Sequence, residues 1–261
     1  MPSVMPQPPH KPEGRRQASP AARRPFGRGR PVSLFTLGTM RALESASALA
    51  DVLEEALAAG INHIETAPAY GPAEAFLGKA LAALAQRDGE AHAGLVVTSK
   101  LLPGPGEGVG LAEGMAQLRA TLARLGIARL DNLAVHGLNT PAHLAWALQG
   151  DGADLLEAAL AEGLVGQVGF SSHGETPLIE AALASGRFSF CSLHLHLLDP
   201  ERMPLARQAL AAGIGVMAIS PADKGGRLYD PPEFLVADCA PFAPLELAYR
   251  YLLAEGISTL T

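Results

Sequence analysis

Four titratable side chains stand where short apolar segments of the sequence end. Glu65 and Tyr70 follow the first such segment, Lys100 ends a second and His136 ends a third. A phenol beside an ammonium and an imidazole can protonate a carbonyl oxygen, because the cation stabilises the phenolate and lowers its pKa from about 10 toward the neutral range. If the four residues converge, they indicate an enzyme that reduces carbonyl groups.

A repeating unit of the sequence would supply the strands that position these residues. From residue 33 onward, a short apolar segment is followed by an amphipathic stretch rich in alanine and leucine, and glycine often ends that stretch. The predicted strands are Ser33–Thr39, His63–Thr66, Leu95–Ser99, Leu130–Val135, Gln167–Ser171, Phe190–Leu197, Gly215–Ser220 and one that begins at Ile257. The predicted helices are Ala46–Ala59, Ala73–Ala85, Leu111–Leu125, Asp154–Glu162, one that Thr176 caps and Pro177 opens, and Met203–Ala212.

Eight such units predict an α/β fold, a (β/α)8 TIM barrel. The apolar segments recur at intervals of about 23 to 42 residues, which a strand and its crossover helix require. Active sites of these barrels lie at the carboxyl ends of the strands, where Glu65, Lys100 and His136 fall. A doubly wound sheet is the alternative, and it is disfavoured because no Gly-x-Gly-x-x-Gly turn follows the first segment.

Charge is distributed unevenly along the chain. Residues 1–30 contain seven basic residues and one acidic residue, a net charge of +6, which leaves −12 for the rest of a chain whose total is −6. Residues 1–22 are rich in proline and arginine and lack apolar periodicity, so we predict a disordered basic tail there and a barrel domain over residues 23–261. A body so acidic is not expected to bind nucleic acid.

Several classes of protein and of site are excluded by composition. No run of about 18 apolar residues occurs, so no membrane span is expected, and the start lacks the apolar core of a secretory signal. Cys191 and Cys239 are the only cysteines, which excludes a cysteine-built iron–sulfur or zinc site and indicates a reducing, cytoplasmic compartment. His194 and His196 share one face of a predicted strand. No carboxylate or cysteine stands at ligand spacing from them, so we predict no metal site.

The segment Gly60–Gly71, followed by Lys100 and His136, resembles the aldo-keto reductases. The likeness covers about residue 23 to the end and continues in three later segments, His136–Pro141, Val168–Gly174 and Ile219–Tyr229. It is closest to a prokaryotic branch whose members often carry a cysteine-rich iron–sulfur tail, although no such cluster is expected in this chain. The resemblance implies a TIM barrel that reduces a small aldehyde or ketone with a nicotinamide cofactor, usually NADPH, with NADH as the alternative.

The resemblance also implies residue roles, carried over position by position. Tyr70 matches the proton donor, Lys100 its partner and His136 the residue that orients the substrate, while Glu65 stands where most members have aspartate. The residues expected to contact the cofactor are Thr39, Met40, Glu65, Ser171, Ser172, Ser192, Ser220, Ala222, Lys224 and Gly225. Ser192 replaces a longer amide side chain, so we expect it to reach the nicotinamide through water.

The chain ends at Thr261, inside the expected eighth strand. The resemblance then implies a barrel truncated there, without the basic residues that grip the adenosine 2′-phosphate, so NADPH and NADH are expected to bind with similar affinity. An incomplete barrel would expose apolar helix flanks, which predicts self-association. A non-catalytic nucleotide-binding or regulatory subunit is the alternative function.

Overall fold

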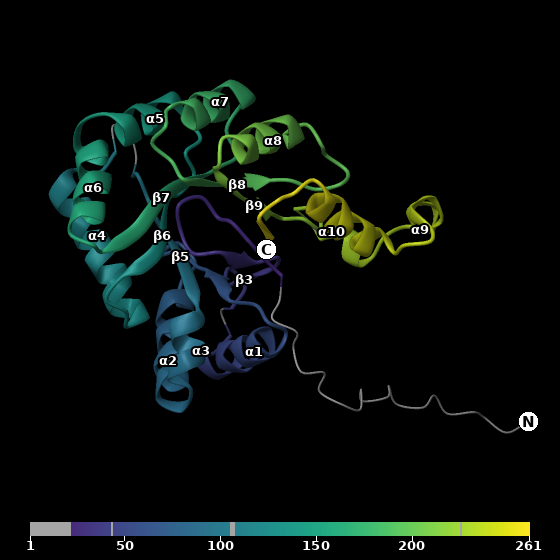
Figure 1. Ribbon diagram of the computed structural model, residues 1–261, viewed down its shortest axis with the longest axis horizontal. Coiled ribbons are helices and arrows are strands. Elements are labelled where there is room, and N and C mark those ends of the chain that lie inside the picture. The colour runs from purple at the N-terminus through teal and green to yellow at the C-terminus, as the bar shows by residue number, and fades with distance from the viewer. Residues whose placement is uncertain (1–21, 43, 105–107, 225) are drawn as a thin grey trace, which may run out of the picture.

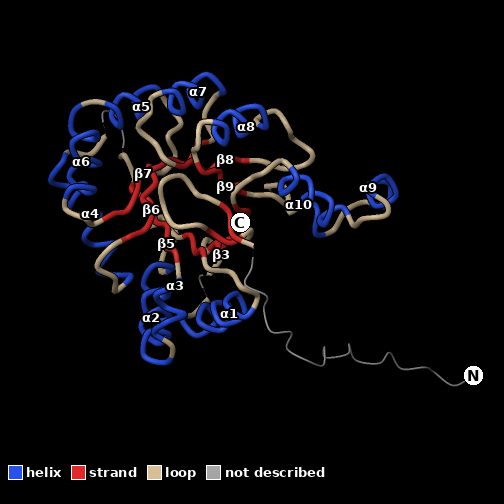
Figure 2. The backbone as a smooth tube through the Cα atoms, viewed as in Figure 1, coloured by secondary structure: helices blue, strands red, loops and turns tan. Residues whose placement is uncertain are grey.

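The computed structural model describes residues 22–42, 44–104, 108–224 and 226–261. Eight parallel strands form its centre, and helices surround them (Figures 1 and 2). In sheet order the strands are β3 (Thr36–Gly38), β4 (His63–Glu65), β5 (Val96–Leu101), β6 (Leu130–Val135), β7 (Val165–Ser172), β8 (Phe190–His194), β9 (Gly215–Ile219) and β10 (Thr259–Leu260). Because the order in the sheet is the order in the chain, each crossover joins neighbouring strands.

The short strand β10 brings the two edges of the sheet together. Thr259 pairs in parallel with Met217 of β9, and Leu260 forms a parallel bridge with Phe35 just before β3. The backbone N–H of Leu260 also donates a 3.0 Å hydrogen bond to the carbonyl of Leu34. The sheet is thus a nearly closed barrel, which confirms the predicted (β/α)8 fold.

Local sequence signals set the limits of several helices. Ser45 caps the first helix by accepting a 3.1 Å hydrogen bond from the N–H of Ala48, and Gly126 ends the fourth at a left-handed φ of 66°. The prediction that Thr176 is a cap is wrong, because Glu175 holds that position and Thr176 is already helical. The helices are α1 (Ala46–Ala58), α2 (Ala73–Arg87), α3 (Gly89–Gly94), α4 (Leu111–Leu125), α5 (Pro141–Leu148), α6 (Gly150–Ala161), α7 (Thr176–Ala184), α8 (Met203–Ala211), α9 (Glu233–Cys239) and α10 (Pro244–Ala254), with a 3-10 turn η1 (Arg227–Tyr229).

Alternation along the strands separates two apolar cores. In β8, Cys191 and Leu193 belong to the larger core between the barrel and its helices, whereas Phe190 belongs to the core inside the barrel. Successive strand residues point to opposite faces, so Ser192 faces the barrel interior with Phe190.

A hairpin that precedes the first barrel strand closes one end of the barrel. Its strands β1 (Arg23–Arg24) and β2 (Val32–Ser33) pair antiparallel, and Phe26 between them is fully buried. The Phe26 ring lies 5.0 Å from the ring of Phe190 and 5.3 Å from that of His63, between centroids. Since His63 and Phe190 begin β4 and β8, the hairpin covers the amino ends of the strands and leaves the carboxyl ends for a site.

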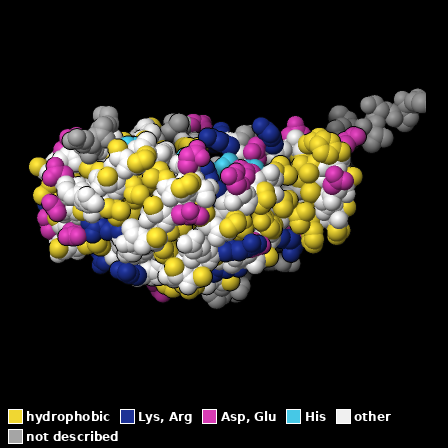
Figure 3. Space-filling model, turned by 90° about the horizontal axis from the view of Figure 1, so that it is seen from above, with side chains coloured by type: hydrophobic (Ala, Val, Ile, Leu, Met, Phe, Trp, Pro, Cys, Tyr) yellow, Lys and Arg dark blue, Asp and Glu magenta, His cyan; other side chains and the backbone are white. Residues whose placement is uncertain are grey.

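The predicted tail over residues 1–22 lies outside the described residues except for Ala22, so its disorder and the domain boundary stay predictions. Within the part of the chain that is described, no helix is long and apolar enough to cross a membrane. Hydrophobic side chains gather on the end of the molecule that carries α9 (Figure 3). Tyr229 of η1 and Phe234 of α9 are exposed.

Candidate active site

The four residues predicted for catalysis lie at the carboxyl ends of three neighbouring strands. Glu65 is the last residue of β4, Lys100 is the penultimate residue of β5 and His136 follows β6. Tyr70 stands in the turn between β4 and α2. These strand ends share one rim of the barrel, and the structure brings the four side chains together there.

Lys100 is the centre of this group. Its Nζ atom donates hydrogen bonds of 2.7 Å to the Tyr70 hydroxyl and 3.3 Å to the Thr66 carbonyl, and it forms an ion pair with Glu65. Glu65 and Lys100 are 4% and 3% exposed, so little solvent screens their attraction. The Glu65 side chain, one methylene longer than aspartate, therefore reaches the lysine directly.

Burial sets the protonation of the phenol and the ammonium. It raises the pKa of Tyr70 to about 12 and lowers the pKa of Lys100 to about 7. The Glu65 carboxylate opposes the fall in the pKa of Lys100, because a negative charge favours the charged lysine. The prediction that the pKa of Tyr70 falls toward the neutral range is wrong, because burial deprives the phenolate of solvation. Tyr70 keeps its proton throughout the neutral range, as a proton donor must.

His136 completes the group from the side of β6. Its ring stands nearly perpendicular to the Tyr70 ring, at 88° and 6.0 Å between centroids. Burial lowers the pKa of His136 to about 4, and the charge of Lys100 and then His173 add to the shift. The imidazole is therefore neutral at pH 7 and carries one N–H that can donate a hydrogen bond.

The two serines at the end of β7 hold the loop that follows His136. Ser171 Oγ accepts a 3.0 Å hydrogen bond from the N–H of Gly137, and Ser172 Oγ donates a 2.6 Å hydrogen bond to the carbonyl of Leu138. These bonds tie the end of β6 to the end of β7. Both residues lie at the rim where the resemblance implies cofactor contacts. Their hydrogen bonds also hold the loop after His136 in place.

Several buried polar atoms near this rim have no hydrogen-bond partner among the described residues, and three of them belong to residues expected to serve catalysis or the cofactor. They are Oγ1 of Thr39, Nδ1 of His136 and Oγ of Ser192. A buried polar atom without a partner is costly, so such atoms mark places for a ligand or water. Met40, beside Thr39, is largely exposed and can cover a ligand only from the solvent side.

The loop after β9 carries the remaining expected cofactor residues. Ser220 has a φ of 56°, a left-handed conformation that is rare outside glycine and that turns the chain sharply across the rim. Ala222 is buried and Lys224 is exposed. Gly225 lies outside the described residues.

One cluster of polar side chains at the rim was not predicted from the sequence. His194 and His196 do have a carboxylate close by, because the turn after His196 returns Asp199 to the strand. The sequence argument considered only residues at strand spacing from the two histidines. Asp199 comes close to them only because the chain turns after His196.

A barrel of eight parallel strands with a phenol, an ammonium, a carboxylate and an imidazole at the carboxyl ends defines the class of the (β/α)8-barrel enzymes. Residues 35–230 match the model of the aldo/keto reductase family. The chain therefore belongs to this family, whose members are oxidoreductases, and the resemblance noted in the sequence is confirmed. None of the curated proteins compared with the chain matches it.

Solved structures of aldo-keto reductases share the fold. A Pseudomonas aeruginosa protein assigned to the aldo-keto reductases is 25% identical, with a TM-score of 0.72 over 94% of this chain and 91% of that chain. The holo form of an aldo-keto reductase from Bacillus halodurans is 21% identical, with a TM-score of 0.76 over 92% and 85%. An aldo-keto reductase from Bombyx mori in complex with NADP is 21% identical, with a TM-score of 0.72 over 94% and 84%.

Proposed function

We propose that this chain reduces a small aldehyde or ketone with NADPH or NADH, and that Tyr70 protonates the carbonyl oxygen. The observation that carries the proposal is the 2.7 Å hydrogen bond from Lys100 to the Tyr70 hydroxyl inside a buried cluster with Glu65. A bound reduced nicotinamide would supply the hydride, and the chain supplies the proton and the positioning.

The hydrogen bond from Lys100 matters most while the proton leaves the phenol. Negative charge then grows on the phenol oxygen, where the lysine N–H already points. A donor aimed at developing charge in a site poor in water stabilises the transition state without a rearrangement. Glu65 keeps the lysine in place and favours its charged form, so its role is to position Lys100.

His136 would hold the substrate oxygen from the other side. The neutral imidazole donates one N–H, and its edge-on arrangement with Tyr70 lets both donors approach the same oxygen. With two donors converging, the carbonyl is oriented and polarised before the hydride arrives.

The cofactor would lie across the ends of β3, β7, β8 and β9. The unpartnered hydroxyls of Thr39 and Ser192 fit an amide or ribose, and Lys224 fits a phosphate. The Bombyx mori relative in complex with NADP supports a nicotinamide cofactor. The two free buried cysteines fit our placement of the enzyme in the reducing cytoplasm. The non-catalytic alternative has no observation in its favour.

The proposal is tested by oxidation of NADPH and of NADH with a panel of aldehydes and ketones. Tyr70→Phe should lower kcat by roughly a hundredfold or more, because general acid catalysis contributes about 10²–10⁴, and should leave cofactor affinity unchanged. Tyr251→Phe on α10, in the helical layer, is the matched control and should keep wild-type rates. Equal kcat in the wild type and Tyr70→Phe would remove Tyr70 from the reaction.

A further inference from the structure

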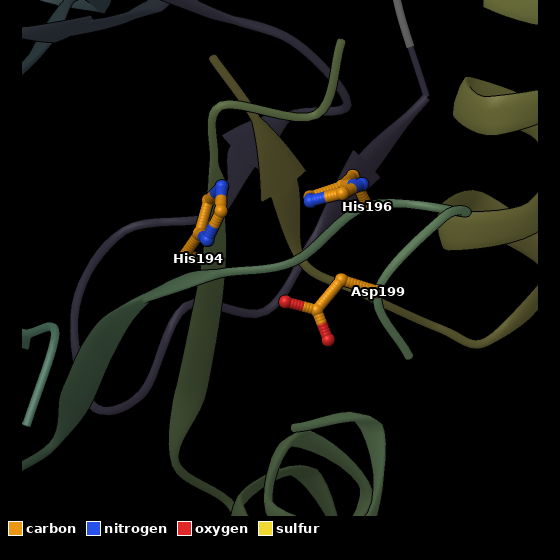
Figure 4. Close-up of side chains that lie close together, drawn as sticks. All are labelled: His194, His196 and Asp199. Carbon is orange, nitrogen blue, oxygen red and sulfur yellow. The ribbon is translucent and has the colours of Figure 1, made fainter. Parts of the chain in front are cut away.

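Three side chains of the kinds that bind metals meet at the carboxyl end of β8. His194, His196 and Asp199 each offer one ligand atom, and these atoms lie within 4.8 Å of one another (Figure 4). The turn that brings Asp199 back is fixed by a 3.1 Å hydrogen bond from its N–H to the carbonyl of His196. We propose that these three residues form a binding site for one divalent transition-metal ion, for which zinc fits best.

Two ring nitrogens in the cluster lack partners. His196 is 5% exposed, and its Nδ1 is buried without a hydrogen-bond partner in the described part of the chain. Nε2 of His194 is buried and unpartnered in the same sense. A buried polar atom without a partner loses its hydrogen bonds to water and gains none in return, and a coordinated metal ion would remove that cost.

A carboxylate supports the buried histidine from outside the cluster. Asp223, in the loop after β9, lies 3.7 Å from Nε2 of His196 and also contacts Arg227 at 3.3 Å. A carboxylate beside a ring nitrogen of a metal-binding histidine fixes the ring orientation and raises its basicity. At 3.7 Å the contact is longer than a hydrogen bond, so Asp223 acts on His196 through its charge.

The cluster combines two imidazoles with one carboxylate. His194 and His196 each offer one ring nitrogen, and Asp199 offers one carboxylate oxygen. A metal ion binds the neutral form of an imidazole and the ionised form of a carboxylate.

The donor set favours a transition metal such as zinc over magnesium or calcium. Imidazole suits zinc, copper and nickel, whereas magnesium and calcium take oxygen ligands. Zinc–nitrogen bonds of about 2.0–2.1 Å place tetrahedral ligand atoms roughly 3.3 Å apart. The separations of up to 4.8 Å would have to contract, which rotation of the exposed Asp199 side chain allows. A water molecule can take the fourth position.

The site can be tested with Co²⁺, whose absorption reports tetrahedral coordination, on the full chain without a histidine tag. We expect one ion per chain with micromolar affinity, displaced by Zn²⁺. His194→Gln, His196→Gln and Asp199→Asn should each weaken binding by at least about tenfold, since even supporting residues of metal sites cost 10–100-fold. The control is His92→Gln in α3, which precedes β5 at the opposite end of the barrel.

Two results would overturn the proposal. One is a Co²⁺ affinity that His194→Gln and Asp199→Asn leave unchanged, which would place any bound ion elsewhere. The other is the absence of saturable binding at millimolar Co²⁺. If the buried His196→Gln variant does not fold, as judged by circular dichroism, the exposed Asp199→Asn variant still decides the question.

Discussion

The ammonium of Lys100 donates a 2.7 Å hydrogen bond to the hydroxyl of Tyr70 while it holds Glu65 in an ion pair. The phenol oxygen therefore acts as acceptor toward the lysine, and its own proton stays available. A competing acceptor, Glu65 Oε1, lies 3.4 Å away, which is long for an O–H donor. One lysine thus orients the phenol, and in the reaction that we propose it would also stabilise the charge that remains when the proton leaves.

Removal of the lysine should cost stability as well as rate. Lys100→Met leaves the Glu65 carboxylate buried without its counter-ion, so the free energy of unfolding should fall by about 3–5 kcal/mol. The double variant Lys100→Met with Glu65→Gln removes that charge and should regain much of the loss. Urea unfolding of the three proteins measures this. A double variant no more stable than Lys100→Met would contradict a charge-based cost.

His136 should act as a neutral donor. His136→Leu removes the N–H and should lower kcat/KM for aldehydes by about a hundredfold, the usual cost of one such donor, whereas His136→Gln keeps an N–H and should lose less. Because its pKa is near 4, the ratio of wild-type to His136→Leu rates should stay constant from pH 5 to pH 8. A ratio that shrinks as the pH rises would show that the charged imidazolium is the active form.

Ser192→Ala should weaken cofactor binding without lowering the stability of the fold. The Oγ atom is buried without a partner in the described structure, so its removal should leave the free energy of unfolding unchanged or raise it. If the hydroxyl contacts the nicotinamide, the cofactor should bind about 2–12-fold more weakly, as one hydrogen bond of 0.5–1.5 kcal/mol implies. Fluorescence titration and urea unfolding measure the two effects. Unchanged affinity would exclude Ser192 from the cofactor site.

His63 should make the fold sensitive to acid. It is fully buried between Thr36 and Thr98, with 2.7 Å hydrogen bonds to both hydroxyls, and burial lowers its pKa to about 3. The unfolded chain, with a His pKa near 6.5, binds the proton first as the pH falls. The stability from this residue is therefore complete above pH 6.5, and about 2 kcal/mol of it is lost by pH 5.

The acid sensitivity is measured by urea unfolding at pH 7 and pH 5. His63→Gln should show a shallower pH dependence than the wild type, with an equal m value so that the same states are compared. Parallel pH dependences in the two proteins would assign the acid sensitivity to other groups.

The limits of the barrel strands and helices could be predicted where apolar segments alternate with glycine. The predicted limits Leu130–Val135 and Leu111–Leu125 are those of β6 and α4. The hairpin of β1 and β2 was missed because Phe26 and Val32 stand among arginines and glycines, with no period to mark them. The structure shows that both residues pack in the core inside the barrel, which no local pattern in the sequence indicates.

The site could be predicted as a set of residues but not as an electrostatic environment. Strand ends brought Tyr70, Lys100 and His136 to one rim, because parallel strands end together. The pKa of Tyr70 was predicted in the wrong direction, since the degree of burial is a property of the packed structure. Asp199 was missed for a related reason, because a turn rather than strand periodicity brings it to His196.

The hairpin of β1 and β2 covers the amino ends of the strands, where Phe26 packs against Phe190. Ligands can therefore reach Tyr70 from the rim at the carboxyl ends of the strands. If a cofactor and a substrate both bind at this rim, as we propose, they share one face of the barrel. The molecule that lies deeper would then have to bind first and leave last.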